Sequence, residues 1–193
     1  MNIGITLTSS LSVGQEYIDL TQVVSKKLAE NNFGIVYGGT DYGMMSELAN
    51  SYINNGGKNI IGVTAKDLIN VTANYKFFEK LNDSFVMSTM GERISKIISL
   101  SDGFIILPGG YGTFEEMGTI IGGNVNKLYQ KPIVILNYNG FYNSLIKFLN
   151  EMFKKKFSKI SISDVVLVTD DIDDAITHLQ KFQKIDLPDK FVS

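Results

Sequence analysis

Residues 107–116 read Leu-Pro-Gly-Gly-Tyr-Gly-Thr-Phe-Glu-Glu, a glycine-rich turn between an apolar run and a predicted helix. The preceding residues 103–107 have the length and apolarity of a strand that is buried on both faces of a parallel sheet. Residues 115–121 predict the opening of a helix. At such a strand-to-helix turn the backbone can approach a ligand closely, and free N–H groups face an anion. The alternative is a glycine turn without a ligand, because glycine motifs alone are weak signals.

Two carboxylates, Glu115 and Glu116, fall in what the sequence predicts to be the first turn of this helix. There they would complement the positive end of the helix dipole. Consecutive helical residues differ by about 100° in direction, so only one of the two can face a cleft. That residue could act chemically on the molecule to which the anion belongs.

Strand and helix patterns alternate along the rest of the chain. Further strands are expected at residues 3–7, 34–37, 59–63, 133–136 and 165–168, and further helices at 16–30, 43–55, 90–100, 141–153 and 173–182. Residues 64–88 are expected to form an excursion that contains one short strand. This rhythm predicts right-handed βαβ units in an α/β fold, an open parallel sheet with helices on both faces. We expect a single domain over residues 1–182, followed by a tail over residues 183–193.

Composition excludes several classes of function. A length of 193 residues, with 44% hydrophobic and 20% charged residues, fits one ordinary globular domain. A net charge of -2 does not favour nucleic acid or an anionic membrane as partner. The chain has no cysteine and one histidine, His178, so thiolate and histidine metal sites are not expected. With neither a leader pattern nor a long apolar run, the sequence predicts a soluble cytoplasmic protein.

Three turns follow predicted strands, at the sheet edge where open α/β sheets bind ligands. Two glycine-rich turns of this kind predict two backbone cradles along one nucleotide-sized cleft. The residues of the three turns that are candidates for the site are Ser9 and Ser10; Gly38, Gly39, Thr40 and Gly43; and Gly109, Gly110, Tyr111, Gly112 and Thr113.

Arg93 lies in the first turn of the helix predicted before the central strand. An exposed arginine on a helix face is the ordinary interpretation, but near this edge its planar guanidinium could hold a phosphate, a carboxylate or a ribose hydroxyl. The first strand lacks the glycine fingerprint of dinucleotide-binding proteins, and the chain has no phosphate-binding loop ending in Gly-Lys-Ser or Gly-Lys-Thr. These absences argue against a nicotinamide oxidoreductase and an NTPase.

Residues 108–116 resemble the motif Pro-Gly-Gly-x-Gly-Thr-x-x-Glu of the LOG ("lonely guy") family. These proteins are cytokinin riboside 5'-monophosphate phosphoribohydrolases that were long mislabelled as lysine decarboxylases. Further similar stretches are residues 36–45, the pair Gly56-Gly57, and residues 90–93 and 131–142. The resemblance covers roughly residues 1–180.

The resemblance implies a Rossmann-like fold and a homodimer whose site lies near the subunit interface. It also implies hydrolysis of the N-glycosidic bond of a purine nucleoside 5'-monophosphate, cytokinin-like or AMP-like, without metal or organic cofactor. Glu116 would be the catalytic carboxylate and Arg93 its partner. The glycines of residues 109–112 and Thr113 would hold the phosphate, and Ser9, Ser10 and Met90 are candidates for the substrate pocket.

The chain departs from the family pattern at five positions, the first of which is Thr89 in place of an aspartate. Gly91 and Ile94 replace a histidine and a lysine, Thr119 replaces a glutamate, and Gly123 replaces a tryptophan. These changes leave cytokinin specificity open. They also support the alternative of a LOG-like module that binds or senses a nucleotide without cleaving it. Retention of both Arg93 and Glu116 favours the enzyme, since a binding module needs no carboxylate.

Overall fold

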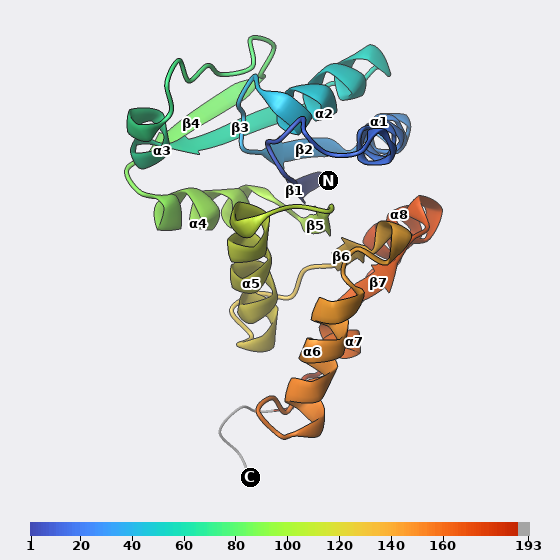
Figure 1. The fold of residues 1–193 in the computed structure, drawn as a ribbon. Helices are drawn as coiled ribbons and strands as arrows, with labels where there is room; N and C mark the ends of the chain where they lie inside the picture. The colour runs from blue at the N-terminus through green and yellow to red at the C-terminus, as the bar shows by residue number, and fades with distance from the viewer. Residues whose placement is uncertain (189–193) are drawn as a thin grey trace.

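Seven parallel strands form one sheet in the computed structural model of the protein, which describes residues 1–188 (Figure 1). The strand order across the sheet is β4-β3-β2-β1-β5-β6-β7. This arrangement confirms the predicted α/β, Rossmann-like open sheet. The strands are β1 (Asn2–Thr6), β2 (Gly34–Tyr37), β3 (Ile60–Ala65), β4 (Asp83–Met87), β5 (Gly103–Ile106), β6 (Ile133–Leu136) and β7 (Leu167–Thr169).

Helices cover both faces of the sheet (Figure 1). Side chains alternate between the faces along each strand, so Ile35 belongs to the core cluster on one face and Val36 to the core cluster on the other. The helices are α1 (Gln15–Glu30), α2 (Gly43–Asn54), α3 (Lys66–Val71), α4 (Met90–Leu100), α5 (Tyr111–Val125), α6 (Asn143–Lys154), α7 (Ile162–Val165) and α8 (Ile172–Lys181), with a 3-10 turn η1 (Tyr138–Gly140) before α6.

The strand order reverses between β1 and β5, which pair in parallel with Thr6 opposite Ile106. The chain leaves β1 toward α1 on one face and leaves β5 toward α5 on the other. Their two connections therefore diverge at the carboxyl edge and leave room there for a ligand.

Helix α5 begins earlier than the sequence predicted. It starts at Tyr111, directly after Gly110, and the Phe114 N–H donates to the Gly110 carbonyl in its first turn. The expectation that Glu115 and Glu116 lie in the first turn is therefore wrong: both lie in the second turn, and their interaction with the helix dipole is correspondingly weaker.

The excursion contains the one short strand that the sequence predicted, and also a helix that the sequence did not predict. Residues 66–71 form α3, and residues 83–87 form β4, the edge strand beside β3. In the expected tail, Leu187 is buried in the core under α5 and α7, while residues 189–193 lie outside the described part. Among the helices of residues 1–188, each is too short or too polar to cross a membrane.

Candidate active site

A buried ion pair joins the two helices that flank β5. The Arg93 Nη1 atom of α4 lies 2.6 Å from the Glu116 Oε1 atom of α5. Arg93 is only 4% exposed and Glu116 only 8%, so the pair is shielded from water. The interpretation of Arg93 as an exposed surface arginine is therefore excluded. A charge-assisted hydrogen bond at this distance fixes both side chains in one geometry.

The fold holds Arg93 in place from two sides. The hydroxyl of Thr89 caps α4 by accepting from the Glu92 N–H, which sets the first turn that carries Arg93. The Arg93 Nε–H donates to the Val63 carbonyl near the end of β3, at 2.9 Å. The guanidinium is thereby aligned between strand β3 and the carboxylate of Glu116.

The environment of Glu116 changes its acidity. Burial raises the pKa of this carboxyl above its ordinary value of 4.5, and the charge and hydrogen bond of Arg93 oppose that rise. Its neighbour Glu115 is exposed, as helix geometry required for one of the two. Glu116 is thus the inward-facing carboxylate, with a pKa shifted toward the range useful for proton transfer.

The turn at residues 109–113 presents open backbone. Gly110 and Gly112 are exposed, and a Cβ atom built on either one would meet no other atom within 4 Å. Thr113 is 4% exposed and packs directly against Gly109. Its Oγ1 atom makes no hydrogen bond within residues 1–188. A buried hydroxyl without a partner beside free backbone fits the predicted phosphate site.

Tyr142 supports this turn from behind. Its hydroxyl donates to the Leu107 carbonyl at 2.8 Å, and the ring is 6% exposed. Burial raises the pKa of this phenol, so it stays protonated as a donor. The turn at residues 109–113 therefore starts from a fixed position at the end of β5.

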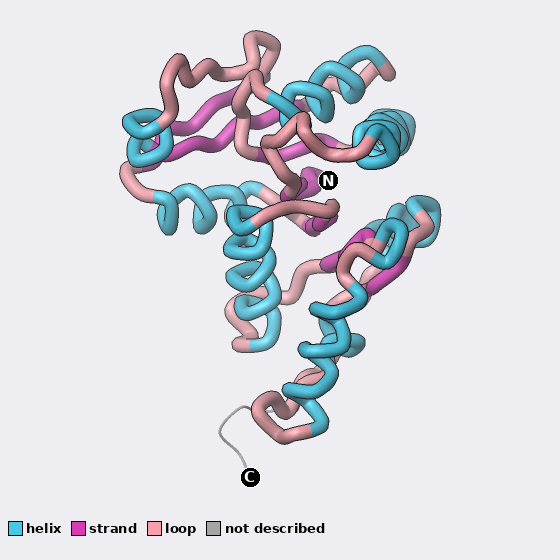
Figure 2. The backbone as a smooth tube through the Cα atoms, viewed as in Figure 1, coloured by secondary structure: helices cyan, strands magenta, loops and turns pink. Residues whose placement is uncertain are grey.

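The turn at residues 38–41 differs from the turn at residues 109–113, because some of its backbone groups are already hydrogen-bonded to another part of the chain. The Asp41 N–H donates to the Lys76 carbonyl and the Gly39 carbonyl accepts from the Phe78 N–H, both at 2.9 Å. The long connection between α3 and β4 thus lies against this turn (Figure 2). Only part of the second predicted cradle remains free for a ligand.

A cavity of about 480 Å³ lies between this turn and the connection. Of the candidate residues, Ser9, Gly38, Thr40 and Arg93 line it. Its other lining residues are Asp41, Tyr42, Met45, Leu68, Thr72, Ala73, Asn74, Tyr75 and Lys76. The fold therefore brings Arg93 to the wall of a cavity large enough for part of a nucleotide.

A second hollow of about 240 Å³ is lined by Gly109, Gly110 and Thr8, together with apolar residues of α1 and α2. Tyr111, the next residue of the turn at residues 109–113, is 95% exposed. Hence the candidate residues divide between two cavities, and Arg93 of the ion pair borders the larger one.

The four remaining turn and pocket candidates are Gly39, Gly43, Ser10 and Met90, each with its own local contacts. Gly39 contacts the backbone of Gly62, and Gly43 contacts the carbonyl of Ser9 so closely that a side chain at either glycine would collide. Ser10 uses its Oγ atom to accept from the Ser12 N–H. Met90 begins α4 and is half-buried.

Sequence reasoning missed Tyr75, Tyr42 and Asp41 as cavity residues. Tyr75 lies in the excursion, whose apolar residues follow neither helical nor strand periodicity. The only usable signal was the aromatic cluster of Tyr75, Phe77 and Phe78 in a segment with no predicted core role. Tyr42 and Asp41 directly follow the Gly-Gly-Thr turn and could have been included with it.

The residues that differ from the family pattern lie in different environments. Ile94 is buried, Gly91 faces open space, and the Thr119 hydroxyl donates to the Glu115 carbonyl within α5. Gly123 contacts the ring of Tyr129, whose hydroxyl donates to the Ile120 carbonyl. The ring of Tyr129 thus occupies the space that a side chain at residue 123 would need.

Comparison with known proteins identifies relatives over most of the chain. The sequence model of the family described as "Possible lysine decarboxylase" matches residues 45–179. The probable cytokinin riboside 5'-monophosphate phosphoribohydrolase LOGL6 of Oryza sativa subsp. japonica is 32% identical over 162 residues, which are 83% of this chain and 62% of that protein. Cytokinin riboside 5'-monophosphate phosphoribohydrolase LOG2 of Arabidopsis thaliana is 30% identical over 179 residues, 92% of this chain and 80% of that protein. The chain thus spans less than two thirds of LOGL6.

Solved structures share the fold at lower sequence identity. The molybdenum cofactor carrier protein of Chlamydomonas reinhardtii matches with a TM-score of 0.70 and 19% identity, over 93% of this chain and 96% of that one. The protein TM1055 matches with a TM-score of 0.71 and 14% identity, over 94% and 99% of the two chains. At these identities the likeness establishes the arrangement of strands and helices alone.

Proposed function

The chain belongs to the LOG family, and from this premise we propose that it hydrolyses the N-glycosidic bond of a purine nucleoside 5'-monophosphate. Water would attack the anomeric carbon of the ribose while the bond to the base breaks, giving free base and ribose 5-phosphate. The observation that carries the proposal is the buried pair of Arg93 and Glu116 beside the open turn at residues 109–113. The names of the relatives support the reaction class.

Glu116 would stabilise the reaction electrostatically. Cleavage of the glycosidic bond develops positive charge on the sugar, and a carboxylate close to that charge stabilises it while holding the attacking water. Arg93 fixes the orientation of this carboxylate through the 2.6 Å contact. The raised pKa of Glu116 suits the uptake of a proton from the water as it attacks.

The first turn of α5 would hold the 5'-phosphate. Backbone N–H groups at a helix N-terminus and the unpaired hydroxyl of Thr113 are suitable donors for its oxygens. Binding energy from the phosphate, which does not react, would orient the glycosidic bond at Glu116. No step of this mechanism needs a metal or an organic cofactor.

A second candidate is a LOG-like module that binds a nucleotide without cleaving it. The observation that favours it is the commitment of Glu116 Oε1 to Arg93, which leaves one carboxylate oxygen for catalysis. The molybdenum cofactor carrier protein of Chlamydomonas reinhardtii, which shares this fold, is named for binding. In both cases the ligand would occupy the same edge of the sheet.

Base release separates the two candidates. The purified protein is incubated with AMP and with isopentenyladenosine monophosphate, and free base is followed by chromatography. We expect release from at least one nucleotide, loss of release in Glu116→Gln, and retention in Glu115→Gln, the exposed neighbour. No release from either nucleotide, together with a rise in Tm on adding AMP, would instead establish the binding module. The ratio of the two rates identifies the preferred base.

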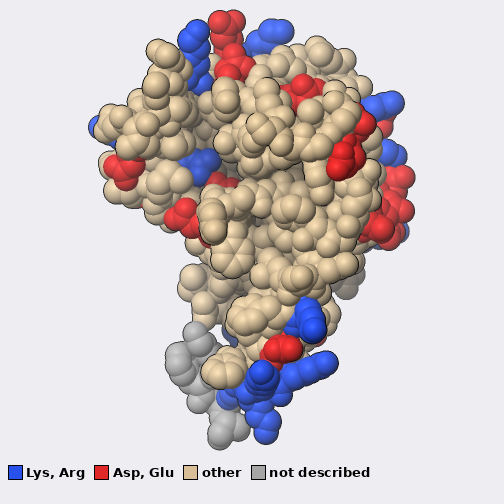
Figure 3. Space-filling model, viewed as in Figure 1, with Lys and Arg blue, Asp and Glu red and all other residues tan. Residues whose placement is uncertain are grey.

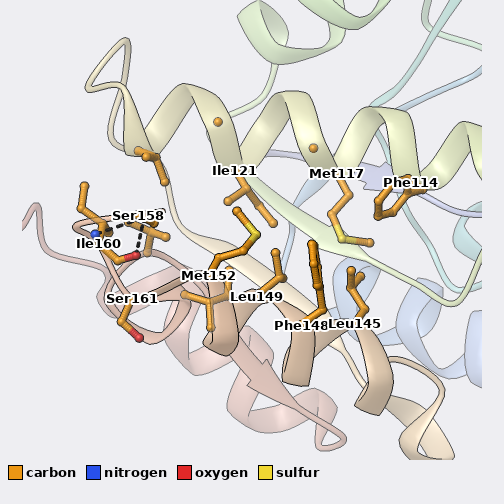
Figure 4. A pocket seen from close by; sticks show the side chains of 15 residues that line it. Phe114, Met117, Ile121, Leu145, Phe148, Leu149, Met152, Ser158, Ile160 and Ser161 are labelled. Carbon is orange, nitrogen blue, oxygen red and sulfur yellow. Dashed lines mark hydrogen bonds between the residues drawn. The ribbon is translucent and has the colours of Figure 1, made fainter. Parts of the chain in front are cut away.

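The proposed assembly is a homodimer with the site near its interface. A groove of about 290 Å³ separates α5 from α6, and apolar side chains of the two helices point into it (Figure 4). Phe148 is 58% exposed and Phe114, two residues before Glu116, is 54% exposed. The surface over these helices carries few charges until the lysines at the end of α6 (Figure 3). A second copy of the chain would cover this apolar face.

Sedimentation tests this assembly. Phe148→Asp places a charge on the groove and is expected to give monomers, while Val23→Asp, an exposed apolar position on α1, leaves the dimer intact. A monomeric parent protein would refute the homodimer without affecting the proposed chemistry. An unchanged dimer in Phe148→Asp would place the interface on another face.

A further inference from the structure

The segment at residues 75–78 is fastened to the turn that follows β2. Lys76 and Phe78 supply the two backbone bonds to Asp41 and Gly39, and Thr40 and Phe77 form an antiparallel bridge. The Phe78 ring is 6% exposed and joins the core under α1 and α2. Residues 75–78 are therefore held in place by the backbone and by one buried ring.

Tyr75 occupies a different position in this segment, since its side chain lines the 480 Å³ cavity together with Arg93. Its hydroxyl lies 3.3 Å from the Gly38 carbonyl, and its ring meets Phe77 edge to face with centroids 5.5 Å apart. Burial raises the pKa of the Tyr75 phenol, and the positive charge of Arg93 lowers it. Ring and hydroxyl are thus close to the guanidinium that borders the cavity.

The position of the cavity indicates which part of a nucleotide it would receive. The phosphate donors lie at residues 109–113, and the reacting bond must lie at Glu116. Arg93 contacts Glu116 and also lines the cavity, so a nucleotide that extends from the phosphate past the pair enters this space with its base. Tyr42, Tyr75, Met45 and Leu68 give the cavity apolar and aromatic walls, which suit a flat purine ring.

We propose that Tyr75 binds the purine base by ring contact and so supplies part of the affinity of the site for the base. This inference rests on the proposed function and adds a residue from the excursion to it. A purely structural role for Tyr75 is the competing explanation. The two 2.9 Å backbone bonds and the buried Phe78 ring fasten the segment independently of the longer Tyr75 contact, which argues against that role.

Comparison of two ligands tests the proposal. Affinity for AMP and for ribose 5-phosphate, which lacks the base, is measured by titration calorimetry. The parent protein for this test carries Glu116→Gln, so that AMP is not cleaved during the titration, and Tyr75→Ala and Tyr75→Phe are made in the same background. We expect Tyr75→Ala to bind AMP about tenfold or more weakly, the loss typical of removing an aromatic ring that stacks on a base. Its affinity for ribose 5-phosphate should change by less than about twofold, because this ligand lacks the base that Tyr75 would contact. Tyr75→Phe, which keeps the ring, should retain most AMP affinity.

Each other outcome is decisive. Equal losses for both ligands in Tyr75→Ala would show that the residue acts through the fold, and unchanged AMP affinity would show that it does not touch the base; both overturn the inference. A Phe variant as weak as the Ala variant overturns the ring contact. If the parent protein binds neither ligand, the proposed function fails, a result distinct from the others. Tyr129→Phe, which removes a hydroxyl bonded to Ile120, controls for the loss of a phenol group.

Discussion

The two glycine turns at the carboxyl edge of the sheet look alike in sequence but differ in structure. At residues 38–41 the glycines are buried, and neighbouring backbone has taken up the Asp41 N–H and the Gly39 carbonyl. At residues 109–113 the glycines Gly110 and Gly112 are exposed with open space around them. The first turn therefore uses glycine to let chain segments approach one another. In the second turn, Gly110 and Gly112 have no such internal reason for glycine, which fits the proposed approach of a ligand to the backbone.

The largest effect is expected at the closed turn. Gly39 has φ +73°, and a Cβ atom there would lie 2.6 Å from the Gly62 Cα atom. Gly39→Ala should lower the free energy of unfolding by about 2–5 kcal/mol, from backbone strain plus overpacking. Urea unfolding measures it.

Gly56→Ala is the matched control, because Gly56 has φ +85° and nothing within 4 Å of a Cβ atom. It should cost about 1–2 kcal/mol, from strain alone. Equal losses in the two variants would show that close approach to Gly62 contributes nothing.

At the open turn, Thr113→Val should act on binding rather than on stability. Loss of a hydrogen bond to a charged phosphate costs about 1.5–3 kcal/mol, or roughly tenfold to a hundredfold in ribose 5-phosphate affinity. Stability should stay the same or rise slightly, because the hydroxyl has no partner within residues 1–188. Calorimetry and urea unfolding measure the two quantities, and a loss of stability with unchanged affinity would reverse the assignment.

Gly112→Ala should also change ribose 5-phosphate affinity and stability in different ways, but by smaller amounts than Thr113→Val. An alanine in α5 favours the helix by up to about 1 kcal/mol. Its methyl group would narrow the approach of a phosphate to the backbone and weaken ribose 5-phosphate binding by about threefold to tenfold, an effect on the order of 1 kcal/mol. Gly118→Ala, a position on α5 with equally open space, should give the helix effect without the binding loss. Identical affinities in the two variants would count against the open turn as a phosphate site.

The smallest effect concerns pH. Because the pKa of Glu116 is raised above 4.5 in the folded state, the native protein holds this proton more readily than the unfolded chain. Stability from this group is therefore greatest at low pH and declines as pH rises through the folded pKa. The ionised carboxylate is the proposed active form, so kcat should rise with pH at a midpoint above 4.5. A pH profile with its acid limb at or below 4.5 would contradict the shielded position of Glu116 during turnover.

Much of the fold could be predicted from the sequence, because buried strands of a parallel sheet carry nearly continuous apolar runs. Residues 34–37 and 133–136 were predicted with their observed bounds. Helix α4 was also predicted with its observed bounds, since Thr89 provides a cap and Ile94 and Ile97 a periodic face. Helix α3 was not predicted, and the short strand of the excursion was predicted without bounds, because the apolar residues of both are few and β4 is a mostly exposed edge strand.

The candidate site could be predicted in part. Residues near the glycine turns were found because glycine and its helix are local signals. The pairing of Arg93 with Glu116 followed from the family motif, whereas their burial did not, because burial depends on how α4 and α5 pack. Tyr75 escaped prediction because its proposed role depends on its position beside Gly38, more than thirty residues earlier in the chain.

The two sides of the site come from separate stretches of chain. Arg93 and Glu116 belong to one continuous helix-strand-helix unit, from α4 to α5, and Arg93 is also held by the Val63 carbonyl of β3. The cavity wall at residues 72–76 belongs to that excursion, which joins neighbouring strands at the margin of the sheet. Insertions, deletions and substitutions there can remodel the wall while the ion pair persists. The architecture thus gives evolution, and protein engineering, a replaceable module for changing what is recognised independently of the chemistry performed.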